Sequence, residues 1–343
     1  MSEPTLRLLS LGAGVQSTTL ALMACRGILD DVDGAIFADT GWEPKAVYAQ
    51  VDRLAVEFER AGIPFYRVSK GNLRADTLDP AARFVSVPWF IRNPDGGDGM
   101  GRRQCTSEYK LAPINRKVRE LLGAKAPAFR HVPRGRVAEQ WIGFSTDEWH
   151  RIANRRLNLY TTQRYPLFEL GMSRKDCERW LRAAGWGHTA KSACIGCPFH
   201  GNAQWRALRD TCECGHHRSA HYGDEWECGA TVHTGPAVNG LDFGQGCECS
   251  RFRAPEWADA VDFDRRIRKG GNRVGAGQLD GEAFLHRSRV PLDLAPIDRV
   301  TPREWADRQT DIFDELAEHG DPDGCSPYGC RSGEPLDFGE AST

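Results

Sequence analysis

The stretch LRLLSLGAGVQSTTLALMACRG, residues 6–27, decides the fold of this protein. Its apolar beginning, LRLLSL, predicts a buried strand, and TLALMACRG predicts a helix that ends at Gly27. Between them lies the loop GAGVQST, residues 12–18. A strand, a glycine-containing loop and a helix in this order can surround an anion with backbone N–H groups and a helix N-terminus. The stretch therefore predicts an α/β fold with an anion site at its first turn.

Strand-like and helix-like stretches alternate after this beginning. GAIFAD predicts a second strand that ends at Asp39, a helical pattern of apolar residues follows, and IPFYRVS, residues 63–69, predicts a third strand. This alternation is typical of a parallel sheet with helices on both faces. Ligands of such sheets bind beyond the carboxyl ends of the strands. We therefore expect the segments 12–17, 39–43 and 69–72 at one ligand-binding edge.

Five segments carry a resemblance to a known family. LSLGAGVQST followed by FADTGWEP resembles the PP-loop superfamily of ATP pyrophosphatases (adenine nucleotide alpha hydrolases), and is most similar to its phosphoadenosine phosphosulfate reductase branch. Three later segments resemble that family in the same order: RQCTSEYKLAPI at 103–114, QWIGFSTDEWHR at 140–151 and YPLFEL at 165–170. Gly12 and Gln16 replace the serine and the acid that are usual in the family loop. The resemblance implies a Rossmann-like fold that binds an adenine nucleotide.

The same resemblance implies roles for particular residues. Loop amides would bind phosphate, the segment after the second strand would hold magnesium or a ribose hydroxyl, and basic residues would clamp pyrophosphate or sulfate. The nucleotide-binding residues expected on this basis are Gly12, Ala13, Gly14, Gln16, Ser17, Thr18, Asp39, Thr40, Gly41 and Arg151. The catalytic residues expected are Arg103, Cys105, Lys110, Cys194 and Cys197. A surface ion pair is the alternative role of each basic residue.

Three cysteines lie in or near these segments. SACIGCPFH contains Cys194 and Cys197, and a C-x-x-C motif puts two thiolates within reach of one metal ion or of each other. With Cys105 and a fourth cysteine near the C-terminus, Cys325 or Cys330, they could ligate a four-iron four-sulfur (4Fe-4S) cluster. Zinc or a redox disulfide is the alternative. The sulfur chemistry of related enzymes favours the iron–sulfur cluster.

Residues 211–253 differ in composition from the rest of the chain. They contain two C-x-C pairs and the motif C-G-H, and they have too few apolar residues for a core. A short segment without a hydrophobic core needs a cross-link to fold, and a bound zinc ion supplies one. The candidate ligands are Cys212, Cys214, His216, His217, His221, Cys228, Cys247 and Cys249. These candidates exceed the four positions of a tetrahedral ion, so the ligand set stays open. A purely structural zinc is favoured over a finger that recognises a substrate.

These features divide the chain into four parts. We expect a nucleotide-binding domain over 1–210, an inserted zinc module over 211–253, a helical part completing the main domain over 254–320, and a flexible tail over 321–343. Helices are predicted on both sides of the insertion, at 205–210 and 254–271. The fold class expected is therefore a Rossmann-like α/β domain that carries a small metal-binding module.

The composition agrees with a globular protein. Lys and Arg number 45 against 47 Asp and Glu, so net charge gives no support to nucleic-acid binding by the whole chain, although residues 101–136 form a basic segment. No apolar run approaches the roughly 20 residues that span a bilayer, and no signal peptide is recognised. We expect a cytoplasmic protein without membrane contact. In a reducing compartment, closely spaced cysteines favour metal binding or catalysis over disulfides.

The expected function is ATP-dependent sulfur transfer to a nucleic acid or a nucleoside-like acceptor. ATP or an adenylated sulfate, with Mg²⁺, would be the cofactors, and a sulfur-donor protein would be a partner. The alternative is reduction of phosphoadenosine phosphosulfate (PAPS) or adenosine phosphosulfate (APS), although the tail lacks the E-C-G-[LI]-H motif that supplies the reductase nucleophile. A third class is a zinc-containing nucleic-acid-binding protein that has lost catalysis, which the zinc module and Gln16 would support.

Overall fold

The computed structural model describes most of the chain. The described residues are 4–82, 87–152, 158–187, 189–222, 227–228, 231–232, 245–247, 249, 251–271, 279–302 and 304–305. The chain divides into two compact units, Met1–Ala295 and Pro296–Thr343. Residues 306–320 of the expected helical part and the whole expected tail over 321–343, with Cys325 and Cys330, lie outside the described residues. The fold described is therefore that of the first unit.

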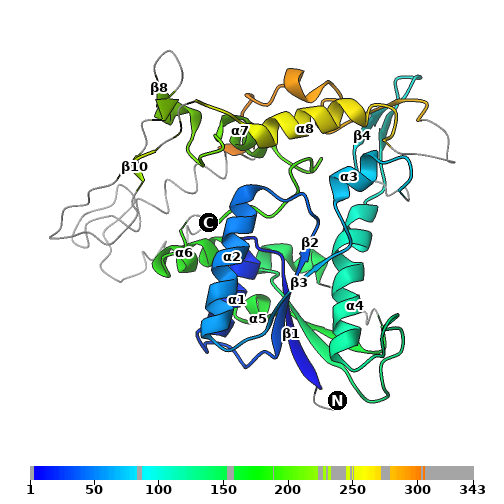
Figure 1. Ribbon diagram of the computed structural model, residues 1–343, viewed down its shortest axis with the longest axis vertical. Coiled ribbons are helices and arrows are strands. Elements are labelled where there is room, and N and C mark those ends of the chain that lie inside the picture. The colour runs from blue at the N-terminus through cyan, green and yellow to red at the C-terminus, as the bar shows by residue number, and fades with distance from the viewer. Residues whose placement is uncertain are drawn as a thin grey trace, which may run out of the picture. The chain divides into compact units, whose positions relative to one another are not determined.

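A five-stranded parallel sheet forms the centre of this unit (Figure 1). The strands lie in the order β3-β2-β1-β6-β7, and every neighbouring pair is parallel. Their bounds are β1 (Leu6–Leu11), β2 (Gly34–Asp39), β3 (Phe65–Ser69), β6 (Ala138–Ile142) and β7 (Thr161–Arg164). The chain builds the sheet outward from β1 to β3 and then returns to the other side of β1. An α/β fold with a parallel sheet, as predicted from the sequence, is confirmed.

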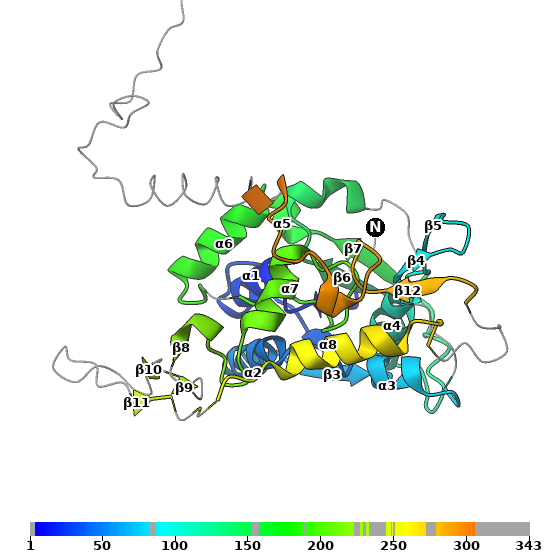
Figure 2. The ribbon, with the colours of Figure 1, turned by 90° about the horizontal axis from the view of Figure 1, so that it is seen from above.

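Helices cover both faces of the sheet (Figures 1 and 2). Their bounds are α1 (Val15–Cys25), α2 (Lys45–Arg60), α4 (Ala112–Leu121) and α6 (Arg174–Ala183). Side chains of β1 alternate between the layers: Leu9 and Leu11 pack with α1, α2 and α6, whereas Leu8 packs with α4. A strand buried on both faces needs apolar residues at every such position, which explains the sequence LRLLSL.

The start of α6 follows its sequence. Ser173 Oγ accepts a hydrogen bond from the backbone N–H of Asp176, and the Asp176 carboxylate accepts one from the backbone N–H of Ser173 at 2.8 Å. This reciprocal pair satisfies two N–H groups that the helix leaves open at its first turn. Residues 173–176 therefore form a capping box.

Two further helices lie beyond the carboxyl ends of the strands (Figure 1). They are α7 (Asn202–Asp210) and α8 (Pro255–Arg266). Trp42, which follows β2, donates from Nε1 to Asp259 of α8 at 2.6 Å. Trp205 of α7 and Trp257 of α8 meet edge to face, with ring centroids 6.5 Å apart. The two helices therefore pack against each other over this edge of the sheet.

The remaining elements are short. They comprise α3 (Leu73–Leu78), α5 (Pro166–Glu169), a π-helical turn (Thr106–Leu111) and 3₁₀ turns at Thr146–Arg151, Arg218–Ala220 and Leu292–Leu294. A three-stranded antiparallel sheet has the order β12-β4-β5, formed by Glu282–Phe284, Phe90–Arg92 and Asp98–Met100. Two small ribbons pair β8 (His221–Tyr222) with β9 (Glu227–Cys228) and β10 (Thr231–Val232) with β11 (Gln245–Gly246).

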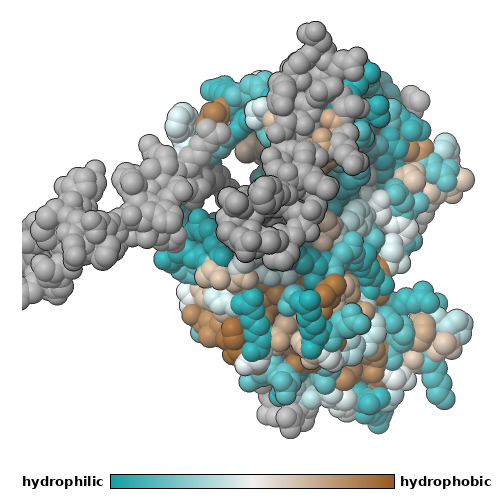
Figure 3. Space-filling view, turned by 60° about the vertical axis from the view of Figure 1, so that its left-hand side comes forward, coloured by the Kyte–Doolittle hydropathy of each residue, from teal (hydrophilic) through white to brown (hydrophobic). Residues whose placement is uncertain are grey.

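None of the helices in the described ranges is both long enough and apolar enough to cross a membrane. On the face shown in Figure 3, hydrophilic residues predominate, with small hydrophobic areas between them. Large apolar side chains that are exposed, such as Trp149 and Leu159, come from separate segments. Apolar residues scattered in this way are normal on a folded protein and indicate no site by themselves.

Candidate functional site

The loop between β1 and α1 is short and firmly held. Ala13 has a φ of 56°, in the left-handed region, and its side chain is fully buried. A non-glycine residue keeps this conformation only where its surroundings impose it. Ser17 Oγ accepts a hydrogen bond from the backbone N–H of Gly14 at 3.1 Å. The first-turn N–H groups of α1 have no preceding turn to bond, so this end of the helix favours an anion.

Gln50 of α2 supplies the constraint on this loop. Its Nε2 donates to the carbonyl of Ala13 and to Thr18 Oγ1, both at 2.8 Å, and its Oε1 accepts from the backbone N–H of Ala190 at 2.8 Å. Thr18 is fully buried, so its hydroxyl serves this network and does not reach the loop surface. Sequence analysis did not single out Gln50. A polar residue on the buried face of an amphipathic helix was the available signal.

The loop after β6 lies against the first turn of α1. A Cβ on Gly143 would come within 2.9 Å of the backbone N and Cα of Ser17, so only glycine fits. β1 and β6 are neighbours in the sheet although they are far apart in the chain. A position at which the strand order reverses in this way is where open α/β sheets bind their ligands. The loop before Val15 is therefore at the favoured edge of the fold.

Gln16 and Arg151 meet through one carboxylate near this turn. Gln16 Nε2 donates to Glu148 Oε2 at 3.1 Å, and its Oε1 accepts from Arg174 Nη1 at 3.3 Å. Arg151 forms an ion pair with Glu148, and its guanidinium lies 4.3 Å from the ring centroid of Phe144. The sequence had suggested that Gln16 removes a carboxylate from the loop. Glu148, which sequence analysis did not assign, brings a carboxylate back to the same place.

The loop after β2 is shaped by Asp39 and Gly41. Asp39 Oδ1 accepts from the backbone N–H of Gly41 at 2.7 Å and from the hydroxyl of Tyr48 at 2.8 Å. Burial, and then the Asp39 carboxylate, raise the pKa of Tyr48, so that phenol remains a donor. Gly41 has a φ of 69°, and a Cβ there would lie 2.9 Å from Cα of Asn72. The positive φ and the close approach to Asn72 both require glycine at position 41. The close approach also brings the loops after β2 and β3 into contact.

Cys194 lies beside a buried carboxylate at this edge. Its Sγ is 3.2 Å from Thr40 Oγ1 and donates to Glu43 Oε1 at 3.5 Å. Lys110 Nζ also pairs with Glu43 Oε1, at 3.3 Å, and the Glu43 side chain is fully enclosed. Within the described residues, Glu43 Oε2 has no hydrogen-bond partner. Such a carboxylate, beside a thiol and an ammonium group, is suited to accepting a proton.

Neighbouring charges influence the pKa values of Lys110 and Cys194. Burial lowers the pKa of Lys110, but the charge of the Glu43 carboxylate counters it, and the pKa stays above its usual value. Burial, and then the Glu43 charge, raise the pKa of Cys194. The resting arrangement is therefore a charged Lys110 beside a neutral thiol. A metal ion or an electrophile would be needed to draw out the thiolate.

Cys105 and Cys197 lie in the same neighbourhood. Each has a pKa raised by burial first, and the two thiols interact electrostatically, whereas Arg103 lowers both pKa values. Arg103 donates from Nε to Thr106 Oγ1 at 3.0 Å and lies over the ring of Phe199. Cys105 is followed by the π-helical turn, a rare conformation that is frequent at functional sites. We call Cys105, Cys194 and Cys197 the sheet-edge thiols.

The turn that carries Cys194 and Cys197 rests on Trp42. A Cβ on Gly196 would come within 2.1 Å of the Trp42 ring, and the backbone N–H of Ile195 donates to the Trp42 carbonyl at 2.9 Å. His200 Nε2 donates to the carbonyl of Cys194 at 3.0 Å, and burial lowers the pKa of His200 to about 4. The C-x-x-C turn is therefore fixed by an aromatic ring on one side and a neutral imidazole on the other.

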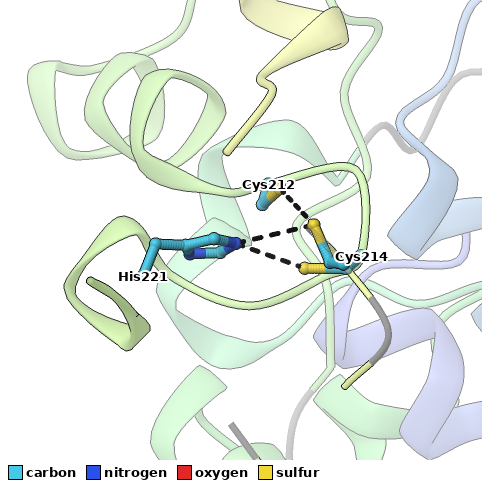
Figure 4. Close-up of side chains that lie close together, drawn as sticks. Cys212, Cys214 and His221 are labelled. Atoms are coloured by element: carbon cyan, nitrogen blue, oxygen red, sulfur yellow. Dashed lines mark hydrogen bonds between the residues drawn. The ribbon is translucent and has the colours of Figure 1, made fainter. Parts of the chain in front are cut away.

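A second group of cysteines lies after α7. The Cys/His cluster consists of Cys212, Cys214, His221 and Cys249, whose ligand atoms all lie within 4.8 Å of one another. Figure 4 shows three of these side chains, Cys212, Cys214 and His221, pointing toward one another. Burial raises the pKa of Cys212, but the backbone N–H groups of Cys214 and Arg253 outweigh it, and the pKa falls to about 7. This cluster could hold a metal ion.

The other predicted ligands of the segment divide into two kinds. His216 and Cys247 come within the same distance of Cys214 and form a smaller group with it. Cys228 pairs with His221 across the β8–β9 ribbon through the backbone. His217 accepts from the backbone N–H of Ser219 through Nδ1 at 3.1 Å. The structure thus assembles the cluster from both cysteines of the first C-x-C pair, one cysteine of the second pair and one histidine.

Comparison of the sequence with protein-family models and with curated proteins finds no match. The function must therefore be argued from the geometry of these two sites. One site has an amide-rich loop, a set of buried thiols and paired charges at the edge of a parallel sheet. The other has four soft ligands in close contact. The first arrangement suits bond-making chemistry on a bound anion, and the second suits holding an ion.

Proposed function

We propose that this protein is a PP-loop enzyme that uses ATP for sulfur transfer, with a nucleic acid or a nucleoside-like molecule as acceptor. The observation that carries the proposal is the convergence of the sheet-edge thiols with Lys110 and Glu43. Cys194 is two residues along the chain from Ser192, which lies against Gly14 of the loop before α1. The strand order β3-β2-β1-β6-β7 supports a Rossmann-like arrangement, because it is the order of doubly wound nucleotide-binding sheets.

Nucleotide binding is assigned to the loop and to the segment after β2. Backbone N–H groups of residues 13–17 would donate hydrogen bonds to phosphate oxygens, with the positive end of the α1 dipole behind them. Asp39 would hold a magnesium ion or a ribose hydroxyl, because its carboxylate ends β2 at the same edge. Arg103 and Lys110 would neutralise charge that develops on the leaving pyrophosphate.

The proposed reaction has two steps. An acceptor oxygen attacks the α-phosphorus of ATP, the bond to the β-phosphate oxygen breaks, and pyrophosphate leaves. A sulfur nucleophile from a donor then attacks the carbon that bears the adenylated oxygen, and AMP leaves with that oxygen. Glu43 is placed to take the proton from Cys194 when that thiol binds a metal ion or reacts.

The thiols of the C-x-x-C turn and Cys105 would ligate an iron–sulfur cluster. Three thiolates in one neighbourhood, beside the proposed nucleotide site, suit such a cluster. When bound, the cluster would supply an iron position able to hold sulfide. Anaerobically purified protein should contain iron and sulfide, and Cys194→Ala should remove both. A parent protein with zinc and no iron would exclude the cluster and leave the thiols a structural or disulfide role.

ATP turnover tests the proposed function directly. We expect the full-length protein to release AMP and pyrophosphate, and Ser17→Ala to weaken ATP binding at least about 10-fold through loss of the loop geometry. Ser173→Ala is the matched control, because it removes a helix cap of α6 without touching the loop. Ser17→Ala protein that binds ATP like the parent would contradict the loop assignment.

Two other functions remain as alternatives. Reduction of PAPS or APS would use the same loop and a thiol nucleophile, and sulfite release from either compound would favour it. A zinc-containing nucleic-acid-binding protein without catalysis would bind nucleic acid but release no AMP. The paired Glu43 and Lys110 favour an enzyme, since a buried carboxylate with one unpartnered oxygen costs stability and a catalytic role would explain its presence.

A further inference from the structure

The Cys/His cluster has the dimensions of a tetrahedron around one ion. Around tetrahedral zinc, two thiolate sulfurs lie about 3.8 Å apart and a sulfur and an imidazole nitrogen about 3.5 Å apart, given the usual bond lengths of about 2.3 and 2.0 Å. Cys212 Sγ and Cys249 Sγ are 3.6 Å apart. His221 Nε2 lies 3.7 Å from Cys214 Sγ and 3.8 Å from Cys249 Sγ. The four ligands of an iron–sulfur cluster are divided between two or more irons, and four ligand atoms that all lie within 4.8 Å of one another leave no room for that division.

The imidazole of His221 is oriented for coordination. Its Nδ1 lies 3.3 Å from the carbonyl oxygen of His217, which can only accept, so Nδ1 carries the hydrogen. Nε2 is then left with a lone pair directed at the sulfurs. A ligating histidine fixed by a carbonyl in this way is the usual arrangement in zinc sites. His221 is also buried, with its ring edge to face against Phe252.

We propose that the Cys/His cluster holds one structural zinc ion, which fastens the end of α7 to the segment that enters α8. Three sulfurs and one nitrogen in tetrahedral array favour zinc over harder cations. The second group, with His216 and Cys247, offers three donors and shares Cys214, so it is incomplete as a separate site. The proposal is independent of the proposed function, because none of the four ligands belongs to the nucleotide loop or to the sheet-edge thiols.

Backbone hydrogen bonds already bring the two chain segments together at the zinc position. The backbone N–H of Arg253 donates to Cys212 Sγ at 3.2 Å, and that of Glu213 donates to the Arg253 carbonyl at 2.7 Å. N–H groups directed at a sulfur stabilise its thiolate form. Cys212 follows the last residue of α7 closely, and Arg253 precedes α8. One ion at this point therefore cross-links both helices at their adjoining ends.

This cross-link has a consequence for the sheet edge. α8 holds Trp42 through Asp259, and Trp42 supports the C-x-x-C turn through its contact with Gly196. α7 begins directly after that turn and packs on α8 through Trp205. Loss of zinc should therefore loosen the support of the C-x-x-C turn. The zinc site is thus a brace for the pair of helices that covers the sheet edge.

Metal analysis of paired cysteine variants tests the proposal. Zinc per chain is measured by mass spectrometry in the full-length parent and in Cys249→Ser, His221→Ala and Cys247→Ser. We expect Cys249→Ser and His221→Ala each to lose one zinc equivalent relative to the parent, and Cys247→Ser to retain it. Cys247 and Cys249 belong to the same C-x-C pair, so Cys247→Ser controls for general disturbance of the segment.

Cobalt substitution covers the case in which a ligand variant does not fold. Cobalt in the parent should give the intense visible absorption of a tetrahedral ion with thiolate ligands, at one equivalent for this site. Octahedral cobalt spectra would overturn the proposal, as would zinc retained by Cys249→Ser. Loss of zinc with Cys247→Ser, or of two equivalents with Cys249→Ser, would also overturn it, since either result requires the second donor group.

Discussion

The sheet-edge thiols and the Cys/His cluster are both built from cysteine, but the cysteines have different surroundings. In the cluster, the donor atoms lie within 4.8 Å of one another, and backbone N–H groups lower the pKa of Cys212. Among the residues that the structure describes, the sheet-edge thiols form no group of that closeness, and Glu43 and Lys110 lie among them. The spacing of cysteines in the sequence is therefore less informative than their neighbours. Close soft donors suit the binding of an ion, whereas the sheet-edge thiols lie among charges that the proposed reaction would use.

The largest effect on stability is expected from a substitution of Gly196, the glycine of the C-x-x-C turn. Gly196→Ala would place a Cβ within 2.1 Å of the Trp42 ring, which Asp259 and Phe263 hold on its other sides. Neither neighbour can move freely, so we expect a loss of more than about 3 kcal/mol of unfolding free energy. Chemical denaturation measures it. A variant as stable as the parent would mean that the C-x-x-C turn does not rest on Trp42.

Acid pH is expected to lower the unfolding free energy through a histidine that contacts the start of α7. His286 Nε2 donates to Asn202 at the start of α7, and Nδ1 accepts from the backbone N–H of Ser288. Burial, and then Arg287, lower the pKa of His286 from 6.5 to about 4. Its contribution to stability is complete above pH 6.5 and is lost as the pH falls toward 4, amounting to about 2 kcal/mol by about pH 5.

The His286→Gln variant isolates this effect. Glutamine can bond Asn202 without titrating, so the variant should lose less unfolding free energy than the parent between pH 7.5 and about pH 5. Equilibrium denaturation at both pH values provides the comparison. Parallel pH profiles for the two proteins would show that His286 is not the group responsible.

A smaller loss of stability is expected when the ion pair between Lys110 and Glu43, which lies among the sheet-edge thiols, is broken. Lys110→Met leaves the enclosed Glu43 carboxylate without its cation. Because a third of the Lys110 side chain is exposed, the expected cost is about 1–2 kcal/mol, below that of a fully buried pair. The double variant with Glu43→Gln should recover part of this loss. If the two substitutions are instead additive in the double-mutant cycle, the pair is not coupled.

The smallest effect belongs to the glycine of the cluster turn. Gly215 follows Cys214 as Gly196 precedes Cys197, but a Cβ on Gly215 would meet nothing within 4 Å. Its φ of 88° is then the only obstacle to alanine, and Gly215→Ala should cost about 1 kcal/mol while zinc is retained. Thermal denaturation together with zinc analysis checks this. A cost equal to that of Gly196→Ala would remove the contrast between the turns.

The sequence predicted the parts of the fold that depend on local patterns. The strand Leu6–Leu11, the turn into α1 and the Ser173 cap are all encoded by neighbouring residues, and each was found. The alternation of strands and helices predicted the parallel sheet. The residue types of the Cys/His cluster were also evident, because metal ligands such as Cys212 carry a signal in their spacing.

The contacts that complete both sites could not be predicted in this way. Gln50 bonds Ala190 from 140 positions away, and Cys212 meets Cys249 across 37 positions. No local pattern encodes either contact, since each depends on how separate elements pack. The π-helical turn after Cys105 was missed for a related reason: its residues also suit an α-helix, and packing decides between the two. Which four of the eight candidate ligands come together likewise depends on the folded structure.

The paired backbone at Glu213 and Arg253 closes a loop of the chain at its base. The entropy cost of closing a flexible loop rises only with the logarithm of its length, and doubling the length adds about 0.6 kcal/mol. Between His221 and Cys247, the entropy of loop closure therefore depends only weakly on the number of residues. Related chains can be expected to differ widely in length there while they preserve both C-x-C pairs, and a peptide tag inserted in that interval should leave the remainder of the molecule intact.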